Sequence, residues 1–155
     1  MRIADHMEKV ERLSELRGQL DPLGDFEIWM WTSMTVATNA VNAVMHHLGI
    51  TAEGDYYAHQ IPGLYVVPPP QAGVWERVIL PPGDVIHVGF PPIRGAVPAR
   101  LQQTFAALTV LEDMREPYVR GDGAITPALV ESCRRAFDDC LAGARALLAE
   151  AQKPA

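Results

Sequence analysis

The sequence predicts a mainly α protein, an antiparallel four-helix bundle with a long proline-rich connection, containing a short β-hairpin or extended segments, between helices 2 and 3. Apolar residues recur three or four positions apart in four stretches, at 3–20, 25–48, 99–116 and 126–150. Nine of the thirteen prolines fall between residues 60 and 98, where their fixed φ and missing N–H exclude helix. At 155 residues and 48% hydrophobic, the chain is expected to form one domain, 1–155, with residues 50–98 as an ordered proline-rich excursion.

The first two helices are delimited by local signals. The first is expected to end at Asp21, because a residue before proline is pushed out of the α region. Its inner stripe is predicted as Ile3, Met7, Val10, Leu13, Leu16 and Leu20. Asp25 is expected to cap the second helix, and Gly49 to follow its last turn. Because Trp29 and Trp31 cannot share a helix face, we expect this helix to be apolar on the core side and on a side that meets residues 50–98 or a second subunit.

The proline-rich segment (residues 50–98) is too apolar for a linker, so we expect it to be ordered. Its strand-like runs are 64–67, 74–80 and 85–88, and the turn sequence at 81–84 would join the last two as a hairpin. A long ordered connection of this kind is where function is expected.

The last two helices carry equally clear boundaries. Pro117 is expected to end the third helix, and Thr126 followed by proline to begin the fourth. Cys133 and Cys140 lie seven residues apart on the fourth helix, which separates them by about 10 Å, beyond disulfide reach. We therefore interpret both as buried small hydrophobic residues on one stripe.

Composition excludes several classes of protein. The net charge of −6 and pI of about 5.3 leave no basic field for non-specific nucleic-acid binding. The N-terminal residues lack the apolar core of a signal peptide, and no run reaches the length of a membrane span. The sequence thus predicts a cytoplasmic protein that does not bind membranes. No cofactor is predicted.

The histidines suggest two alternatives for chemistry. Asn42 and His46 lie four residues apart and share a helix face, whereas His47 points about 100° away from His46. A metal site of His46, His59 and His87 is conceivable, although none of the usual metal-binding spacings is present. Asp84, three residues before His87, could orient its imidazole, so an acid/base site would combine His46, His59, Asp84 and His87. The competing interpretation is that these histidines make ordinary hydrogen bonds.

A second group of candidate residues follows the third helix. Arg115, Tyr118 and Arg120 could grip an anion, because an arginine guanidinium offers a bidentate fork. They could equally satisfy the last helical carbonyls and the acidic residue Asp122.

Two stretches resemble the HEPN superfamily of small helical bundles. They are NAVNAVMHHLGI, which closes the second helix, and LQQTFAALTVLEDMREPYVRGDGAIT, which leads into the last one. The resemblance covers residues 25–50 and 98–150 and implies a dimer. The Arg-x(4–6)-His motif of the ribonuclease members is absent, since Arg2 is followed by His6 after three residues and Arg77 by His87 after nine. The resemblance thus implies a member without nuclease activity.

These observations favour a non-catalytic dimerising or interaction/ligand-binding module, although enzyme activity stays open. As a homodimer it would offer the surface formed by residues 55–98 to a protein partner or a small molecule, with His59, Asp84 and His87 as ligand-binding candidates. One alternative is a metal-dependent or acid/base enzyme with a site around His46, His59, Asp84 and His87. The other is a HEPN-like nucleotide- or RNA-interacting protein that uses Arg115, Tyr118 and Arg120.

Overall fold

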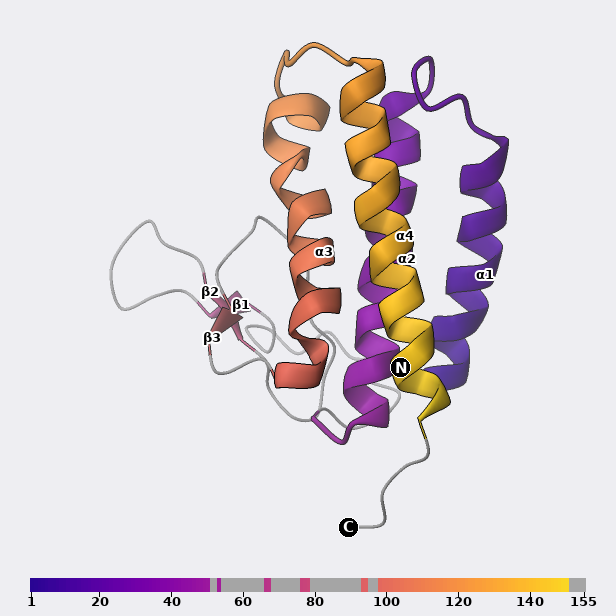
Figure 1. Cartoon of the computed structure of the whole chain (residues 1–155), viewed down its shortest axis with the longest axis vertical. Helices are drawn as coiled ribbons and strands as arrows, with labels where there is room; N and C mark the ends of the chain where they lie inside the picture. Colours follow the sequence, from indigo (N-terminus) through magenta and orange to yellow (C-terminus); the bar gives the residue numbers. More distant parts are fainter. Residues whose placement is uncertain (51–52, 54–65, 68–75, 79–92, 95–97, 151–155) are drawn as a thin grey trace.

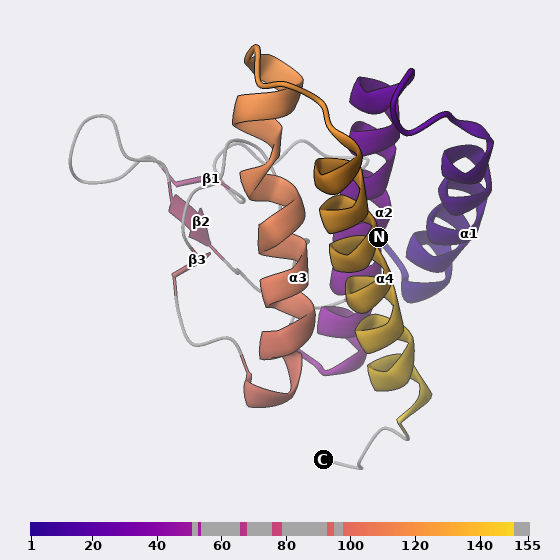
Figure 2. The same cartoon turned by 45° about the horizontal axis from the view of Figure 1, so that its top comes forward.

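The structure, a computed structural model, describes residues 1–50, 53, 66–67, 76–78, 93–94 and 98–150. This part of the chain is mainly helical and contains four α-helices, which confirms the predicted class: α1 (Ile3–Gln19), α2 (Phe26–His47), α3 (Gln102–Asp113) and α4 (Pro127–Ala149). They lie alongside one another in both views (Figure 1, Figure 2).

The central helix is α2, which contacts α1, α3 and α4. Most of its residues are buried, including Trp29, Met30, Met34 and Val41. The apolar core continues into Phe105 and the rest of the inner face of α3, and into the inner face of α4. A side chain on α2 therefore has neighbours on several elements.

The inner face of α1 differs from the predicted stripe. His6 and Val10 are fully buried, while Leu16, expected to face inward, is 42% exposed. Leu13 packs against the core, and Arg17, one turn further, lies against aromatic rings of α2 and α4. Positions 6, 10, 13 and 17 recur every three or four residues, so they form one face of the helix. This face is rotated about the helix axis relative to the predicted apolar stripe.

The predictions for the two ends of α2 had different outcomes. Gly49 has φ of 68°, and its N–H donates to the His46 carbonyl at 3.0 Å while Ile50 N–H donates to Met45 at 2.9 Å. This is a Schellman ending, which confirms the predicted role of Gly49. The prediction for Asp25 was wrong: it holds the N-cap position, but its carboxylate accepts the Asp21 N–H at 3.0 Å instead of a helical N–H. Residues 21–25 form a turn of their own, and the Asp25 carboxylate serves as a hydrogen-bond acceptor within it.

The third helix also ends differently from the prediction. A 3-10 turn, η2 (Ala99–Leu101), precedes α3, and a π-helical turn, η3 (Glu116–Arg120), follows it. Pro117 was expected to stop the winding, but it lies inside η3. Proline donates no hydrogen bond and has a helix-compatible φ, so the α pattern ends near it while the chain keeps turning.

The fourth helix begins as predicted. Thr126 Oγ1 accepts the Leu129 N–H at 3.2 Å, and proline occupies the first turn. Cys133 and Cys140 are buried free cysteines, as expected. Further along, Gly143 packs against α3 so closely that a Cβ atom there would overlap the Thr104 hydroxyl.

Among the described residues between α2 and α3, three short strands occur: β1 (Val66–Val67), β2 (Glu76–Val78) and β3 (Ile93–Arg94). β1 pairs antiparallel to β2, with Val66 opposite Arg77, and β2 pairs parallel to β3, with Arg77 opposite Ile93. The sheet order is β1-β2-β3. The predicted hairpin between 74–80 and 85–88 involves residues outside the described part of the chain.

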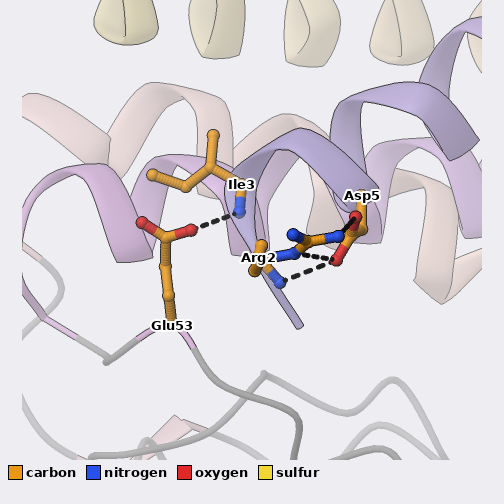
Figure 3. A network of polar contacts seen from close by, with 4 residues as sticks. All are labelled: Arg2, Ile3, Asp5 and Glu53. Carbon is orange, nitrogen blue, oxygen red and sulfur yellow. Dashed lines mark hydrogen bonds and ion pairs between the residues drawn. The ribbon is translucent and has the colours of Figure 1, made fainter.

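The start of α1 is held by charged side chains. Ile3 N–H donates to the Glu53 carboxylate at 2.8 Å, and the Arg2 guanidinium binds Asp5 at 2.8 and 2.9 Å (Figure 3). Carboxylates stabilise a helix N-terminus because they satisfy its N–H groups and oppose its positive dipole end. Glu53 follows α2 closely, so this contact places the start of α1 next to the end of α2.

Candidate functional site

One face of α2 changes character along its length. At 3.6 residues per turn, six side chains share this face: Ile28, Trp31, Thr35, Asn39, Asn42 and His46. Near the start of the helix the face is apolar and open, with Ile28 51% exposed. Near the end it is polar and buried, with Asn39, Asn42 and His46 between 3% and 8% exposed. Such a polar surface inside a helical core calls for a structural or functional reason.

The first contact of this polar surface reaches α1. His6 Nδ1 lies 2.8 Å from Asn39 Oδ1, and Asn39 Nδ2 donates to the Thr35 carbonyl at 2.7 Å. Because a carbonyl can only accept, the second contact fixes which end of the Asn39 amide is the NH₂ group. Its oxygen therefore faces His6, so Nδ1 carries the proton and Nε2 carries the lone pair in the neutral ring.

The second contact joins the two histidines. The rings of His6 and His46 have centroids 5.4 Å apart and are tilted by 38°. We call His6, Asn39, Asn42 and His46 the histidine–asparagine cluster. Asn39 and His46 keep 8% and 6% of their surfaces exposed, whereas His6 is fully enclosed. All four side chains of the cluster are thus buried, and Asn39 and His46 are its most exposed members.

Sequence reasoning found half of this cluster. The spacing placed Asn42 and His46 on one face of the helix and His47 on another. His47 does point elsewhere, since its Nε2 lies 3.0 Å from the Glu150 carbonyl oxygen. His6 was missed because its helix was assigned a purely apolar stripe. Its position four residues before the buried Val10 was the available signal.

The other predicted histidine sites cannot be placed. His59, Asp84 and His87 lie outside the described residues, so the proposed metal and acid/base sites stay predictions. Within the described ranges, no group of three or more histidine, cysteine, aspartate or glutamate side chains is arranged to hold a metal ion.

The three residues predicted to bind an anion do occur together on one turn. Arg115 is buried and Arg120 is half exposed, and both donate to the same oxygen of Glu116, at 2.9 and 3.1 Å. The Arg115 guanidinium also lies 5.8 Å from the Trp31 ring centre, and Tyr118 packs against the core. An external anion at this turn would have to compete with the Glu116 carboxylate.

The two cysteines do not present a nucleophile. Burial raises the pKa of Cys133 to about 11 and that of Cys140 to about 12. The Cys133 thiol also donates to the Met114 sulfur at 3.0 Å. Since the thiolate is the reactive form, neither side chain is activated near neutral pH.

Shallow hollows occur on the surface formed by the described residues. One, of about 250 Å³, lies at the start of α2 and is lined by residues 24–28 and Trp31. Another, of about 300 Å³, lies between α3 and α4 and includes Gln103, Asp139 and Gly143. The first adjoins the exposed Ile28, so it continues the apolar part of the α2 face.

Comparisons with known proteins add no relative. No protein-family model, curated protein or solved structure matches the chain. Among the described residues, no helix combines the length and the apolar character that crossing a membrane requires.

Proposed function

We propose that the protein is a ligand-binding module without catalytic activity, and that the histidine–asparagine cluster forms its binding site. The observation that carries this proposal is the joint burial of four polar side chains where α1 begins and α2 ends. Apolar residues of similar shape would fill this space at lower desolvation cost. Polar groups kept in such a place are well suited to recognising a small polar ligand.

The proposed architecture is an antiparallel four-helix bundle whose proline-rich segment (residues 50–98) connects helices 2 and 3. The short connections at 20–25 and 121–126 support it, as do the contacts of α2 with the other three helices. In this arrangement the cluster lies at the end of α2, after which the chain continues into the proline-rich segment. We keep the cytoplasmic location as an expectation from sequence alone.

A non-catalytic role is favoured by the chemistry of the cluster itself. Asn39 holds the His6 ring through Nδ1, and amide side chains neither accept nor release protons near neutral pH. The buried thiols are also far from their reactive state. The enzymatic alternative requires His59, Asp84 and His87 in addition to His46, and it remains a separate proposal.

Self-association is the second part of the proposal and agrees with what the HEPN resemblance implies. The exposed Ile28, the partly exposed Trp31 and the hollow beside them form an apolar surface at the start of α2. A second copy of the chain is the occupant that we propose, because an isologous contact would cover this surface on both subunits. The bordering Glu27 carboxylate would stay at the rim of the contact.

Light scattering tests this association. The wild-type protein is expected to be a dimer at micromolar concentration, and Ile28→Glu to be a monomer because it places a charge in the contact. Leu16→Glu is the matched control, since Leu16 is an exposed leucine on the outer side of α1. A monomeric wild type, or equal behaviour of the two variants, would contradict the proposal.

Ligand binding is tested with small polar fragments. We would record saturation-transfer NMR of the wild type with a set of imidazoles, carboxamides and short carboxylic acids. A His6→Phe/Asn39→Leu double variant replaces both partners of the hydrogen bond by apolar groups, so it is expected to stay folded. Fragments that bind the wild type should lose their signal with this variant.

The control for this experiment is Gln103→Leu, which alters the hollow between α3 and α4 and leaves the cluster intact. Fragment signals should survive this substitution. Fragments that bind the double variant as well as the wild type, or that respond only to Gln103→Leu, would remove the cluster as the ligand site.

A further inference from the structure

We propose that His6 and His46 are two ligands of a divalent transition-metal ion of the zinc, cobalt or nickel type, bound within the histidine–asparagine cluster. This inference rests on the proposed function, because it names the ligand that the cluster takes. It concerns a different set of residues from the site at His46, His59 and His87, since His6 replaces the two histidines of the proline-rich segment.

Asn39 prepares the His6 ring for metal binding. The Thr35 carbonyl fixes the amide orientation, and the amide oxygen then fixes the proton of His6 on Nδ1. The lone pair of the neutral ring is therefore on Nε2. A metal ion that binds to Nε2 would replace any hydrogen-bond donor that contacts this atom. Metal-bound histidines almost always donate their second ring nitrogen to an oxygen in this way, which orients the ring and raises its basicity.

The separation of the two rings fits a shared ion. Two imidazoles that bind one tetrahedral ion through Nε2 have ring centres roughly 5.3 Å apart, because each centre lies about 3.2 Å from an ion held at about 2.1 Å. The observed distance between the His6 and His46 centroids is 5.4 Å. The ring planes are tilted by 38° to each other, so the two rings are not stacked in parallel. Both rings come from rigid helices, α1 and α2, so their spacing is set by helix packing.

The donor set predicts which ions bind and how tightly. Imidazole nitrogen suits zinc, nickel, copper and cobalt, and does not suit calcium or magnesium. Asn42 lies one turn before His46 on the same face of α2. Among the described residues, no third histidine, cysteine or carboxylate joins the pair. We therefore expect moderate affinity.

Cobalt is the probe for the experiment, because its visible absorption reports both binding and geometry. The full chain would be stripped with a chelator and titrated with CoCl₂, followed by competition with ZnCl₂. His6→Gln and His46→Gln are each expected to weaken binding by at least about tenfold, since each removes one of two imidazole ligands. His47→Gln is the matched control, because the neighbouring imidazole points to Glu150 instead. It should bind cobalt like the wild type.

A measurement on the wild type keeps the proposal testable if His6→Gln does not fold. Zinc should shift the ¹⁵N signals of Nε2 in His6 and His46 while Nδ1 of His6 keeps its proton. Asn39→Leu should weaken zinc binding by about 10- to 100-fold, as loss of an orienting partner does. This variant tests Asn39 as a positioning residue, because its effect would include a change of His6 tautomer.

Several results would overturn the metal proposal. They are cobalt binding that is undiminished in both His6→Gln and His46→Gln, an absence of binding below millimolar concentration, and zinc-induced shifts confined to other histidines. Fragment binding that depends on His6 and Asn39 would survive these results. The failure of the metal assignment is thereby distinguishable from the failure of the ligand site.

Discussion

The inner face of α1 carries a polar residue at each end, and the two ends solve the same problem differently. His6 and Arg17 are three turns apart, with the apolar Val10 and Leu13 between them. His6 is held by a directional hydrogen bond between its Nδ1 and Asn39. Arg17 carries its charge against aromatic surfaces. The comparison shows that one helix face can bury polar groups through geometry at one end and through polarisable contact at the other.

The Arg17 end is built around two rings. The guanidinium carbon lies 4.3 Å from the centre of the Trp29 ring and 3.8 Å from that of Phe137. Its Nε donates to Ser33 Oγ at 2.6 Å, while its buried Nη2 has no hydrogen-bond partner among the described residues. Burial lowers the pKa of Arg17 to about 10, and Asp138 opposes that shift. The rings replace part of the lost solvation through cation–π attraction.

The difference predicts how each end responds to losing a partner. A directional pair leaves an orphaned polar atom when one member is removed, and this carries the full desolvation penalty. A cation between two rings loses its attraction more gradually, because either ring alone still contacts it. The histidine end should therefore be the more fragile one.

The largest effect is expected for Asn39→Leu. This change leaves the buried Nδ1–H of His6 without its acceptor and should lower the free energy of unfolding by about 2–3 kcal/mol. Urea denaturation followed by circular dichroism would measure it. The double variant with His6→Phe should recover at least half of this loss, since both partners are then apolar. A double variant less stable than Asn39→Leu would mean that the hydrogen bond is not the reason for the penalty.

A smaller effect is expected for Arg17→Met, which keeps the length of the side chain and removes its charge. Loss of two cation–π contacts should lower the free energy of unfolding by about 1–2 kcal/mol. This loss is partly offset because the variant no longer has to desolvate a guanidinium group on folding. Arg12→Met is the control, because Arg12 is exposed on the same helix. Equal unfolding free energies for the two variants would show that the ring contacts contribute nothing measurable.

The smallest effect concerns alkaline pH. Burial raises the pKa of Cys133 above its ordinary value of 9.0 to about 11, so the folded state retains a proton that the unfolded state loses. Stability from this group is complete below pH 9 and is lost as the pH rises towards 11. At pH 10, one unit above the ordinary pKa, the loss should be about 1 kcal/mol.

Cys133→Ala isolates this contribution. The difference in unfolding free energy between wild type and variant should shrink between pH 8 and pH 10, where both are measured in urea. A constant difference would mean that the folded state does not shift the Cys133 pKa. The thiol lies near Arg17, whose charge opposes the shift, so Arg17→Met should enlarge the pH dependence.

The elements of this fold were predictable where the signals are local. Gly49 and Thr126 mark helix ends through their own backbone or side-chain chemistry, which needs no knowledge of the rest of the molecule. Asp25 carried the same type of signal, but a neighbouring N–H competed for its carboxylate. Pro117 removed a hydrogen bond as expected without stopping the winding of the chain.

The candidate site was predictable only in part, because it depends on how α1 is rotated against α2. The predicted stripe ends at Leu16 and Leu20, whereas the observed face runs from His6 to Arg17, and both include Val10 and Leu13. Both fit helical spacing, and only packing selects between them. Selecting the second brings His6 inward and leaves Leu16 in solvent. The pairing of His6 with Asn39 follows from that rotation across 33 residues of sequence, a distance that local patterns do not bridge.

The contact between Gly143 and Thr104 has a consequence for recognising relatives of this chain. Since a Cβ at position 143 would overlap the Thr104 hydroxyl, alanine at 143 requires a smaller residue at 104 or a wider separation of α3 and α4. The two positions should therefore vary together among homologues, as a small residue facing a slightly larger one.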